Sequence, residues 1–242
     1  MIQNSREHFN KVGEEGLRGR SGVSAYRDYA EYILQVTAPP EGARALDLGC
    51  GDGRVVRAIA DLRPDLHLVG WDLADEKIAQ ARGESAKHKN IEFEVVDLKG
   101  TLPGEAKFDI AYSFSVIQYF TVAEYVRLNT ELVSKRMDSK GRIHHLSIPD
   151  LSKRYVLFHA DWLDRGSPTN MSTYVHLIKM LIVDIKRRVV GDRRYGDSLF
   201  HDPEELKAQK IPGMSSATSR PSDSWYRFDV CLRKQSIASR KC

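Results

Sequence analysis

Apolar positions divide the first 150 residues of the chain into short strands that alternate with helices. Runs of apolar residues bounded by turn residues predict strands at 45–48, 66–73, 91–98, 108–114 and 141–149. Apolar positions at helical spacing predict helices at 26–36, 55–62 and 75–86, and a fourth that begins at the capping box Thr121-x-x-Glu124. This alternation is typical of a mostly parallel sheet covered by helices on both faces, an α/β fold.

The pattern changes after residue 150. From Met171 to about Val190, apolar residues recur at i, i+3, i+4 and i+7, which predicts a long amphipathic helix with a basic end. Asp202-Pro203 is predicted to open a short helix, and 225–234 alternates as a last strand. The stretch 212–224, rich in serine and glycine, is predicted to be a loop or a weak edge strand.

The most informative stretch is 45–54, which has the sequence ALDLGCGDGR and leads from a strand through a glycine-rich turn into a helix. Such a turn forms the ligand-binding corner of open α/β sheets, because glycine permits unusual backbone angles and a close approach of the ligand. The spacing is G-x-G-x-G, and Arg54 stands where a dinucleotide-binding fingerprint needs its third glycine. Asp47 precedes the first glycine, and a carboxylate there suits a cationic group better than a pyrophosphate.

At these residues the chain resembles the class I S-adenosylmethionine-dependent methyltransferases, whose first motif has the form D-x-G-x-G-x-G and matches 47–53. The resemblance implies a doubly wound, mostly parallel seven-stranded sheet with an antiparallel late strand. It also implies S-adenosylmethionine as cofactor and S-adenosylhomocysteine as product. The resemblance covers about 40–150 well and the two ends poorly. A tight structural turn without a ligand is the alternative interpretation of the motif.

The ends of the later strands supply further candidate cofactor contacts. Asp72 follows Asp47 by 25 residues, near the distance at which nucleotide-binding folds place the acid that accepts hydrogen bonds from a ribose. The alternative role for Asp72 is an N-cap of the next helix. The resemblance implies that Asp97 contacts the adenine amino group. The full set expected to bind the cofactor is Asp47, Gly49, Cys50, Gly51, Asp72, Leu73, Asp97, Leu98 and Ser113.

A hydroxyl acceptor needs a general base, and histidine is the usual base near neutral pH. The catalytic candidates are His145 in the fifth strand, Asp150 just past it, and Tyr119, which the resemblance places where methyl donor and acceptor meet. Further histidine candidates are His144, His159 and His201. Neighbouring residues of a strand face opposite sides, so His144 and His145 cannot both line one site. No pattern requires a metal, and none is expected.

Composition narrows the classes of protein. A chain of 242 residues, 41% of them hydrophobic, has the size of one sizeable α/β domain. The net charge of +4 gives no strong nucleic-acid signal, and three cysteines without a C-x-x-C pair argue against a disulfide framework or structural zinc. Because the sequence shows neither an apolar signal segment nor a run of about 18 apolar residues, we expect a cytoplasmic protein without a membrane span.

We expect four segments: 1–40 as an N-terminal lid or helix, 41–150 as the cofactor-binding core, 151–202 as a helical excursion, and 203–242 as the helix and strand that complete the domain. The excursion covers the acceptor pocket, packs on the core, or forms a subunit contact in a homodimer. The favoured function is O-methylation of a small molecule or of a sugar or phosphorylated glycan precursor, such as a sugar nucleotide. A protein or RNA methyltransferase and a non-catalytic S-adenosylmethionine-binding subunit are the alternatives.

Overall fold

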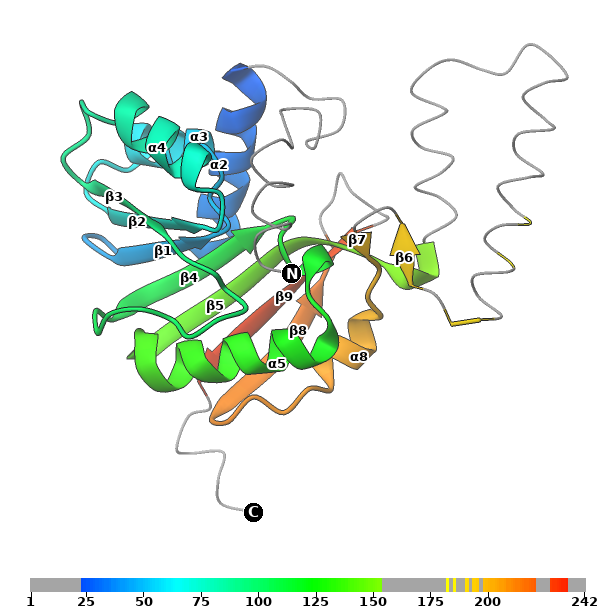
Figure 1. Ribbon diagram of the computed structural model, residues 1–242. Helices are drawn as coiled ribbons and strands as arrows, with labels where there is room; N and C mark the ends of the chain where they lie inside the picture. Colours follow the sequence, from blue (N-terminus) through cyan, green and yellow to red (C-terminus); the bar gives the residue numbers. More distant parts are fainter. Residues whose placement is uncertain are drawn as a thin grey trace, which may run out of the picture.

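A seven-stranded sheet forms the centre of the protein, with the strand order β3-β2-β1-β4-β5-β9-β8 (Figure 1). The computed structural model describes residues 23–153, 198–220 and 227–234, together with positions 182, 185, 190, 191 and 193–195. The strands of the sheet are β1 (Arg44–Leu48), β2 (His67–Asp72), β3 (Ile91–Val95), β4 (Phe108–Phe114), β5 (Met137–Pro149), β8 (Met214–Ser219) and β9 (Arg227–Lys234). A separate pair of short strands consists of β6 (Arg194–Tyr195) and β7 (Ser198–Leu199).

Strands β1 to β5 pair in parallel, β9 pairs antiparallel with β5, and β8 pairs antiparallel with β9. This confirms the predicted doubly wound, mostly parallel seven-stranded sheet. Because β8 pairs antiparallel with β9, it runs in the same direction as β1 to β5, and β9 is the antiparallel late strand that was predicted. Of the two alternatives for 212–224, the edge strand is the one that forms, as β8.

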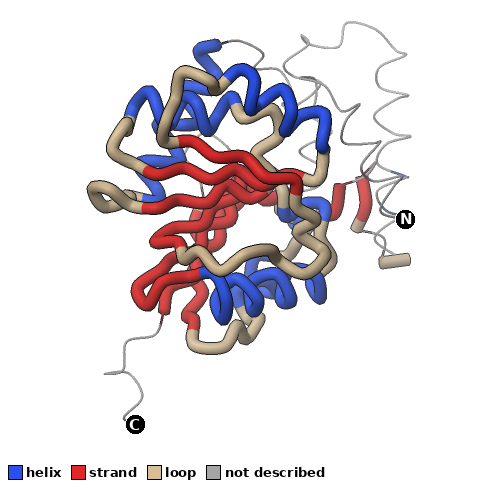
Figure 2. The backbone as a smooth tube through the Cα atoms, turned by 60° about the vertical axis from the view of Figure 1, so that its left-hand side comes forward, coloured by secondary structure: helices blue, strands red, loops and turns tan. Residues whose placement is uncertain are grey.

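Helices cover both faces of the sheet, so the protein has three layers (Figure 2). The helices are α2 (Val23–Thr37), α3 (Arg54–Leu62), α4 (Asp75–Glu84), α5 (Val122–Glu131) and α8 (Pro203–Lys207). Apolar residues of α2, α3 and α4 form one core cluster with the face of the sheet that they cover. Residues of α5 and α8 form a second cluster on the opposite face. Burial of apolar surface in these two clusters stabilises the packing of the helices on the sheet.

Strands β1 and β4 lie side by side and parallel at the centre. The order in which strands are added reverses between them, since β2 and β3 lie on one side of β1 and β5 lies beyond β4. In open α/β sheets, ligands bind at such a reversal, outside the carboxyl ends of the strands. We use the term carboxyl edge for the edge of the sheet formed by the last residues of β1 to β5, namely Leu48, Asp72, Val95, Phe114 and Pro149. The glycine-rich turn at 49–53 begins at this edge.

The register between β4 and β5 decides which side chains share a face. Tyr112 pairs with His144, and Ser113 pairs with His145. His145 contacts Asn129 of α5, whereas Tyr112 lies beside residues of α2 on the other face. The prediction that His144 and His145 face opposite sides is therefore confirmed.

Local sequence signals set the ends of the later elements. Helix α5 begins at the predicted capping box, in which the Thr121 side chain accepts a hydrogen bond from the Glu124 amide and Glu124 bonds back. The chain then passes through a π-helical turn at Leu132–Arg136 into β5, which begins earlier than the predicted residue 141. Helix α8 has the predicted start, with Asp202 as N-cap and proline at the first helical position.

Parts of the predicted excursion lie outside the described residues, including His159 and the basic residues Arg187 and Arg188. The same holds for residues 1–22 of the segment 1–40 that was expected to form a lid or helix. Two residues of the predicted apolar stripe are described, and Ile182 and Ile185 are 48% and 51% exposed. Among the described helices, none has the length and apolar character needed to cross a bilayer.

Candidate functional site

The glycine-rich turn between β1 and α3 has left-handed backbone at all three of its glycines. The φ angles of Gly49, Gly51 and Gly53 are 82°, 56° and 73°. A Cβ atom at Gly49 would lie 2.6 Å from the Val116 side chain, and one at Gly53 would lie 2.6 Å from Phe93. A Cβ atom at Gly51 would meet nothing within 4 Å. The outer two glycines therefore permit close packing, and the middle one presents bare backbone to open space, as a ligand site requires.

Hydrogen bonds tie this turn to the end of β2. The Cys50 amide donates to the Trp71 carbonyl at 3.0 Å, and the Gly51 amide donates to Asp72 Oδ2 at 2.8 Å. Asp72 Oδ1 accepts from the Ala74 amide at 2.9 Å. Ala74, rather than Asp72, is the N-cap residue of α4, so the capping alternative for Asp72 is wrong in that detail. Asp72 instead fixes the position of the turn, and a carboxylate has lone pairs left for a further donor.

The turn lies in a strongly acidic environment. Asp47 at the end of β1 is buried, and burial raises its pKa to about 8, with Asp72 adding to the shift and the Tyr112 hydroxyl opposing it. The pKa of the Cys50 thiol is raised well above its usual range, first by burial and then by the negative charges of Asp47, Asp72 and Asp52. Three carboxylates therefore converge on the turn, and their combined field favours a cationic ligand over an anionic one.

The remaining predicted cofactor residues divide between the carboxyl edge and the core. Asp97 follows β3, is half-buried, and accepts a hydrogen bond from the Lys99 amide at 2.8 Å. Leu73 follows β2 and is half-buried, whereas Leu98 is buried in the cluster on the α5 face. The structure thus brings Asp47, Asp72 and Asp97 to the ends of three adjacent strands.

Ser113 and His145 belong to a hydrogen-bond network in the core beneath α5. The Asn129 amide nitrogen donates to the Tyr125 carbonyl, so its Oδ1 faces His145 Nε2 at 2.9 Å, and that nitrogen carries the proton. His145 Nδ1 then accepts from Ser113 Oγ at 2.9 Å. Both side chains are fully buried, and burial lowers the pKa of His145 to about 3. The structure therefore places neither side chain on the carboxyl edge, and the position of His145 does not favour a general base.

Asp150 and Tyr119 lie near the carboxyl edge in different surroundings. Asp150 is fully buried, forms an ion pair with Arg220 at 2.5 Å, and accepts hydrogen bonds from the amide and hydroxyl of Ser152 at 2.8 Å each. Tyr119 lies in the short 3₁₀ turn Ile117–Tyr119, where it is half-buried and packs against the α5-face core. Of the three catalytic candidates, Tyr119 is the one that keeps an accessible surface.

The other described histidine candidates are also enclosed. His144 is 1% exposed and lies 3.7 Å from the Cys231 sulfur, and its pKa is lowered to about 4 by burial and by nearby arginines. His201 is 2% exposed, and its Nε2 lies 3.1 Å from the Ile117 carbonyl oxygen. Within the part of the chain that the structure describes, no three metal-ligating side chains are grouped as a metal site would need.

Helix α2 contributes residues that the sequence alone did not single out. It turns a row of tyrosines toward the site, namely Tyr26, Tyr29 and Tyr32. The first accepts a hydrogen bond from Arg54 at 3.1 Å, beside the glycine turn. The second stacks at a tilt on Phe114 with ring centroids 4.8 Å apart, and the third donates to Asp229 of β9. The three-residue spacing was the available signal, since such residues share one helix face.

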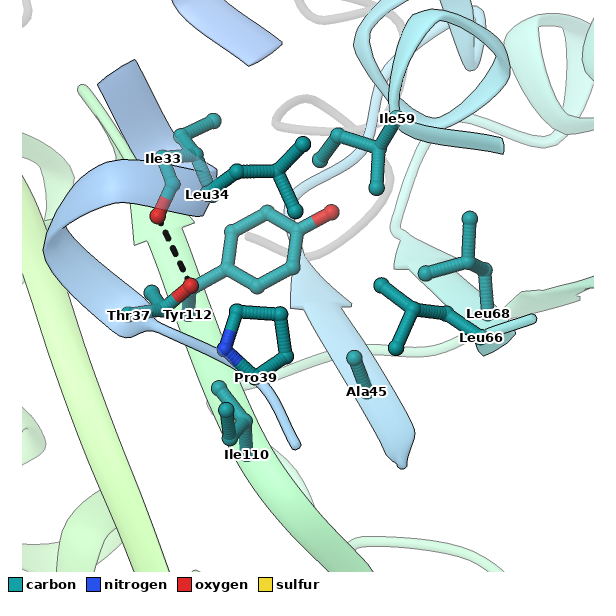
Figure 3. Close-up of a pocket in the computed structure, with 10 residues that line it drawn as sticks. All are labelled: Ile33, Leu34, Thr37, Pro39, Ala45, Ile59, Leu66, Leu68, Ile110 and Tyr112. Atoms are coloured by element: carbon teal, nitrogen blue, oxygen red, sulfur yellow. Dashed lines mark hydrogen bonds between the residues drawn. The ribbon is translucent and has the colours of Figure 1, made fainter. Parts of the chain in front are cut away.

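A small cavity lies on the α2 face of the sheet (Figure 3). Apolar side chains from α2, β1, α3, β2 and β4 line it, and the Tyr112 ring lies among them. Its volume of about 10 Å³ is no larger than one water molecule needs. The cavity is therefore a packing gap between side chains.

Known proteins resemble this chain in the part that contains the glycine-rich turn and the strands around it. Residues 45–135 match a family described as a methyltransferase domain. The trans-aconitate 2-methyltransferase of Streptomyces avermitilis is 31% identical over 97 residues, which cover 38% of this chain and 36% of that protein. The corresponding protein of Variovorax paradoxus is 30% identical over 90 residues, 37% of this chain and 34% of that protein. The chain thus spans about a third of the length of these curated relatives.

Solved structures share the fold over nearly the whole chain. The PH0226 protein of Pyrococcus horikoshii superposes with a TM-score of 0.64 and 16% identity, covering 94% of this chain and 99% of that one. Magnesium protoporphyrin IX methyltransferase of Synechocystis, solved with S-adenosylhomocysteine, has a TM-score of 0.59 and 15% identity, covering 97% and 100%. The chain has the Rossmann-like fold of these methyltransferases, and its residues 45–135 are similar to a family described as a methyltransferase domain.

Proposed function

We propose that this protein is an S-adenosylmethionine-dependent methyltransferase that acts on a small molecule. The observation that carries the proposal is the acidic, glycine-lined turn at the carboxyl edge. Asp47, Asp52 and Asp72 surround it, and Gly51 leaves its backbone accessible. S-adenosylmethionine carries positive charge on its sulfonium and its amino group, so it fits this field, whereas the pyrophosphate of a dinucleotide would be repelled.

Each predicted cofactor contact then has a distinct role. Asp47 holds the cationic amino acid end, Asp72 accepts from the ribose, and Asp97 accepts from the adenine amino group. The backbone of Gly49, Cys50 and Gly51 forms the floor, and Leu73 and Leu98 flank the adenosine. Ser113 does not touch the cofactor, but its hydrogen bond to His145 holds the end of β4 in position. The bound cofactor supplies an activated methyl group, so the protein contributes orientation and exclusion of water.

The acceptor is proposed to be a small molecule that is methylated on oxygen. The matched relatives are named for methylation of trans-aconitate, a small carboxylic acid, and a sugar or phosphorylated glycan precursor is the other acceptor class. In the described ranges, each candidate base except Tyr119 is buried and bonded to protein groups. An acceptor oxygen that is already ionised needs no base, so this arrangement favours a carboxylate over an alcohol. Methyl transfer to total RNA or to protein would support the alternatives.

The test is isothermal titration of the purified protein with S-adenosylhomocysteine and with NADH. Gly51→Val is expected to abolish S-adenosylhomocysteine binding, since a side chain there fills the open face of the turn. Gly42→Val is the matched control, because Gly42 also has a positive φ and open space, in the turn before β1 at the opposite edge. Both variants bear the same backbone strain, so the control should bind as wild type does. Unchanged affinity in Gly51→Val, or comparable binding of NADH, would contradict the proposal.

A further inference from the structure

The thiol of Cys231 lies between an imidazole and a guanidinium on the α2 face of the sheet. Cys231 is in the middle of β9, and it pairs with His144 of β5 on one side and with Ala217 of β8 on the other. Its Sγ lies 3.7 Å from His144 Nε2, and Arg233 Nε donates a hydrogen bond to it at 3.4 Å. Two nitrogen atoms from neighbouring side chains are therefore directed at this sulfur.

The His144 ring indicates which groups donate to the sulfur. His144 is 1% exposed, and because its pKa is lowered to about 4 it is neutral near pH 7. In the part of the chain that the structure describes, its buried Nδ1 has no hydrogen-bond partner. A buried N–H without an acceptor is rarer in folded proteins than a buried acceptor without a donor, so we assign the proton to Nε2. The sulfur then accepts from two N–H groups, which suits an atom that carries negative charge.

The Cys231 thiol is also accessible from solvent. Cys231 is half-buried, and its neighbours across the β8–β9 pair are small and exposed, with Ala217 opposite Cys231 and Ser215 opposite Arg233. The core cluster beneath α2, α3 and α4 includes residues of β1 to β5, and no described residue of β8 or β9 belongs to it. The thiol therefore lies on a part of the sheet face that a small reagent can reach.

Two arginines stand opposite each other beside this thiol. Arg142 of β5 pairs in register with Arg233 of β9, and both contribute to the lowered pKa of His144. Arg142 donates to the Ala38 carbonyl and Arg233 to the Cys231 sulfur, and among the described residues neither has an acidic partner. Like charges directly opposite each other destabilise a strand pair, and an anion bound beside both guanidinium groups would offset that repulsion.

We propose that Cys231 is a modification site that forms a mixed disulfide with a small acidic thiol, whose carboxylates bind to Arg142 and Arg233. The Cys231 thiolate attacks one sulfur of the disulfide form of that thiol. A new S–S bond forms as the old one breaks, so Cys231 is oxidised and the departing sulfur is reduced. The departing thiolate takes up the proton that Cys231 has lost. Guanidinium groups bind carboxylates through paired N–H donors, which makes acidic disulfides the favoured reagents. This inference does not depend on methyl transfer.

The experiment measures mixed-disulfide formation on the purified full chain near neutral pH, by mass spectrometry of the intact protein and of its peptides. The probes are glutathione disulfide, which is anionic, 2-hydroxyethyl disulfide, which is neutral, and cystamine, which is cationic. Each rate is divided by the rate of the same probe with the urea-unfolded chain, so that intrinsic differences between the probes cancel. Cys50 is the reference within the same molecule, because carboxylates surround it and the pKa of its thiol is raised.

The variants separate the charge beside the thiol from the contact with the sulfur. Arg142→Gln removes one positive charge and leaves both groups that contact Sγ in place. Arg233→Gln removes a charge and also the donor to the sulfur. Lys87→Gln is the matched control for net charge, because Lys87 has a 72% exposed side chain and follows α4, near the opposite edge of the sheet.

We expect Cys231 to react with glutathione disulfide about tenfold faster than Cys50 does, and faster than Cys231 reacts with cystamine. Arg142→Gln should slow the anionic probe roughly 3- to 10-fold and leave the neutral probe unchanged, whereas Arg233→Gln should slow both. Lys87→Gln should react as wild type does. Absence of an adduct at Cys231, equal normalised rates for the anionic and cationic probes, or an unchanged rate in Arg142→Gln overturns the inference. The comparison of probes on wild type needs no variant, so it holds even if one fails to fold.

Discussion

Asp47 is a carboxylate that the fold buries next to Asp72, another acid. Burial raises its pKa to about 8, so in the ligand-free protein at pH 7 it is largely protonated. A cation seated beside it favours the ionised form, because the attraction exists only when the proton has left. Binding of S-adenosylmethionine must therefore release a proton below about pH 8, and this links cofactor affinity to pH.

We predict that affinity for S-adenosylmethionine rises as the pH increases from 6 to 8 and then levels off. The rise is at most about tenfold per pH unit, which corresponds to one proton released on binding. Titration in two buffers of different ionisation heat measures that proton directly. Asp47→Asn should bind weakly and without this pH dependence. Affinity that stays constant from pH 6 to 8 in wild type would contradict the assignment of Asp47.

Some properties of single residues cannot be predicted from the sequence. The period of two in a strand correctly separates His144 from His145, but it does not say which of them faces the cofactor. The register between β4 and β5 decides this, and it sets His145 against Ser113 beneath α5. Ser115 and Ser147 give no signal in the sequence, because only the folded contacts impose their positive φ angles.

At the scale of elements, helix α2 is more than a cover for the sheet. Its tyrosine face contacts the glycine turn, the end of β4 and the start of β9 in succession. The helix thereby links the glycine turn to the ends of β4 and β9. Tyr32 carries the longest of these links, since its partner Asp229 is 197 residues away in sequence.

We predict that Tyr32→Phe lowers the free energy of unfolding by about 1–3 kcal/mol, because it removes a hydrogen bond to the buried carboxylate of Asp229. Tyr26→Phe is the control, since the hydroxyl it removes accepts from Arg54 in a less buried place, and we expect a loss below about 1 kcal/mol. Urea denaturation of the two variants and wild type measures both values. Equal stability of Tyr32→Phe and wild type would show that the hydrogen bond to Asp229 does not stabilise the fold.

Strands and helices were easiest to predict where apolar residues stand out clearly from the polar residues around them. Strands β1, β2 and β4 are apolar runs between turn signals, and the glycine turn that follows β1 specifies its own geometry. The sequence did not decide between a loop and a strand for β8, because MSSATS has small polar residues and little alternation. Pairing with β9 makes it a strand. Asp229 offered one signal that was not used, an acid between the apolar residues Phe228 and Val230.

At the scale of the whole molecule, buried ionisable groups should give stability a maximum near neutral pH. The pKa values of His144, His145 and His201 are all lowered from 6.5 in the folded protein, mainly by burial. Below pH 6.5 the unfolded chain binds protons at these sites and the folded chain does not, so stability falls on acidification. Asp47 acts in the opposite sense, because its raised pKa makes the folded chain the one that holds the proton.

The net effect follows from counting protons in the two states. Near pH 5 the unfolded chain gains up to three protons on the histidines and lacks the one on Asp47, a difference of up to two for these four groups. Stability there should change by at most about 2.7 kcal/mol per pH unit. Between pH 7 and 8 the histidines lose their remaining protons in the unfolded chain, and the Asp47 proton of the folded chain then makes stability fall with rising pH, by at most about 1.4 kcal/mol per unit. Urea midpoints measured from pH 5 to 9 test the curve. Asp47→Asn should remove the alkaline decline and keep the acid one, and an unchanged alkaline decline in that variant would show that the proton resides elsewhere.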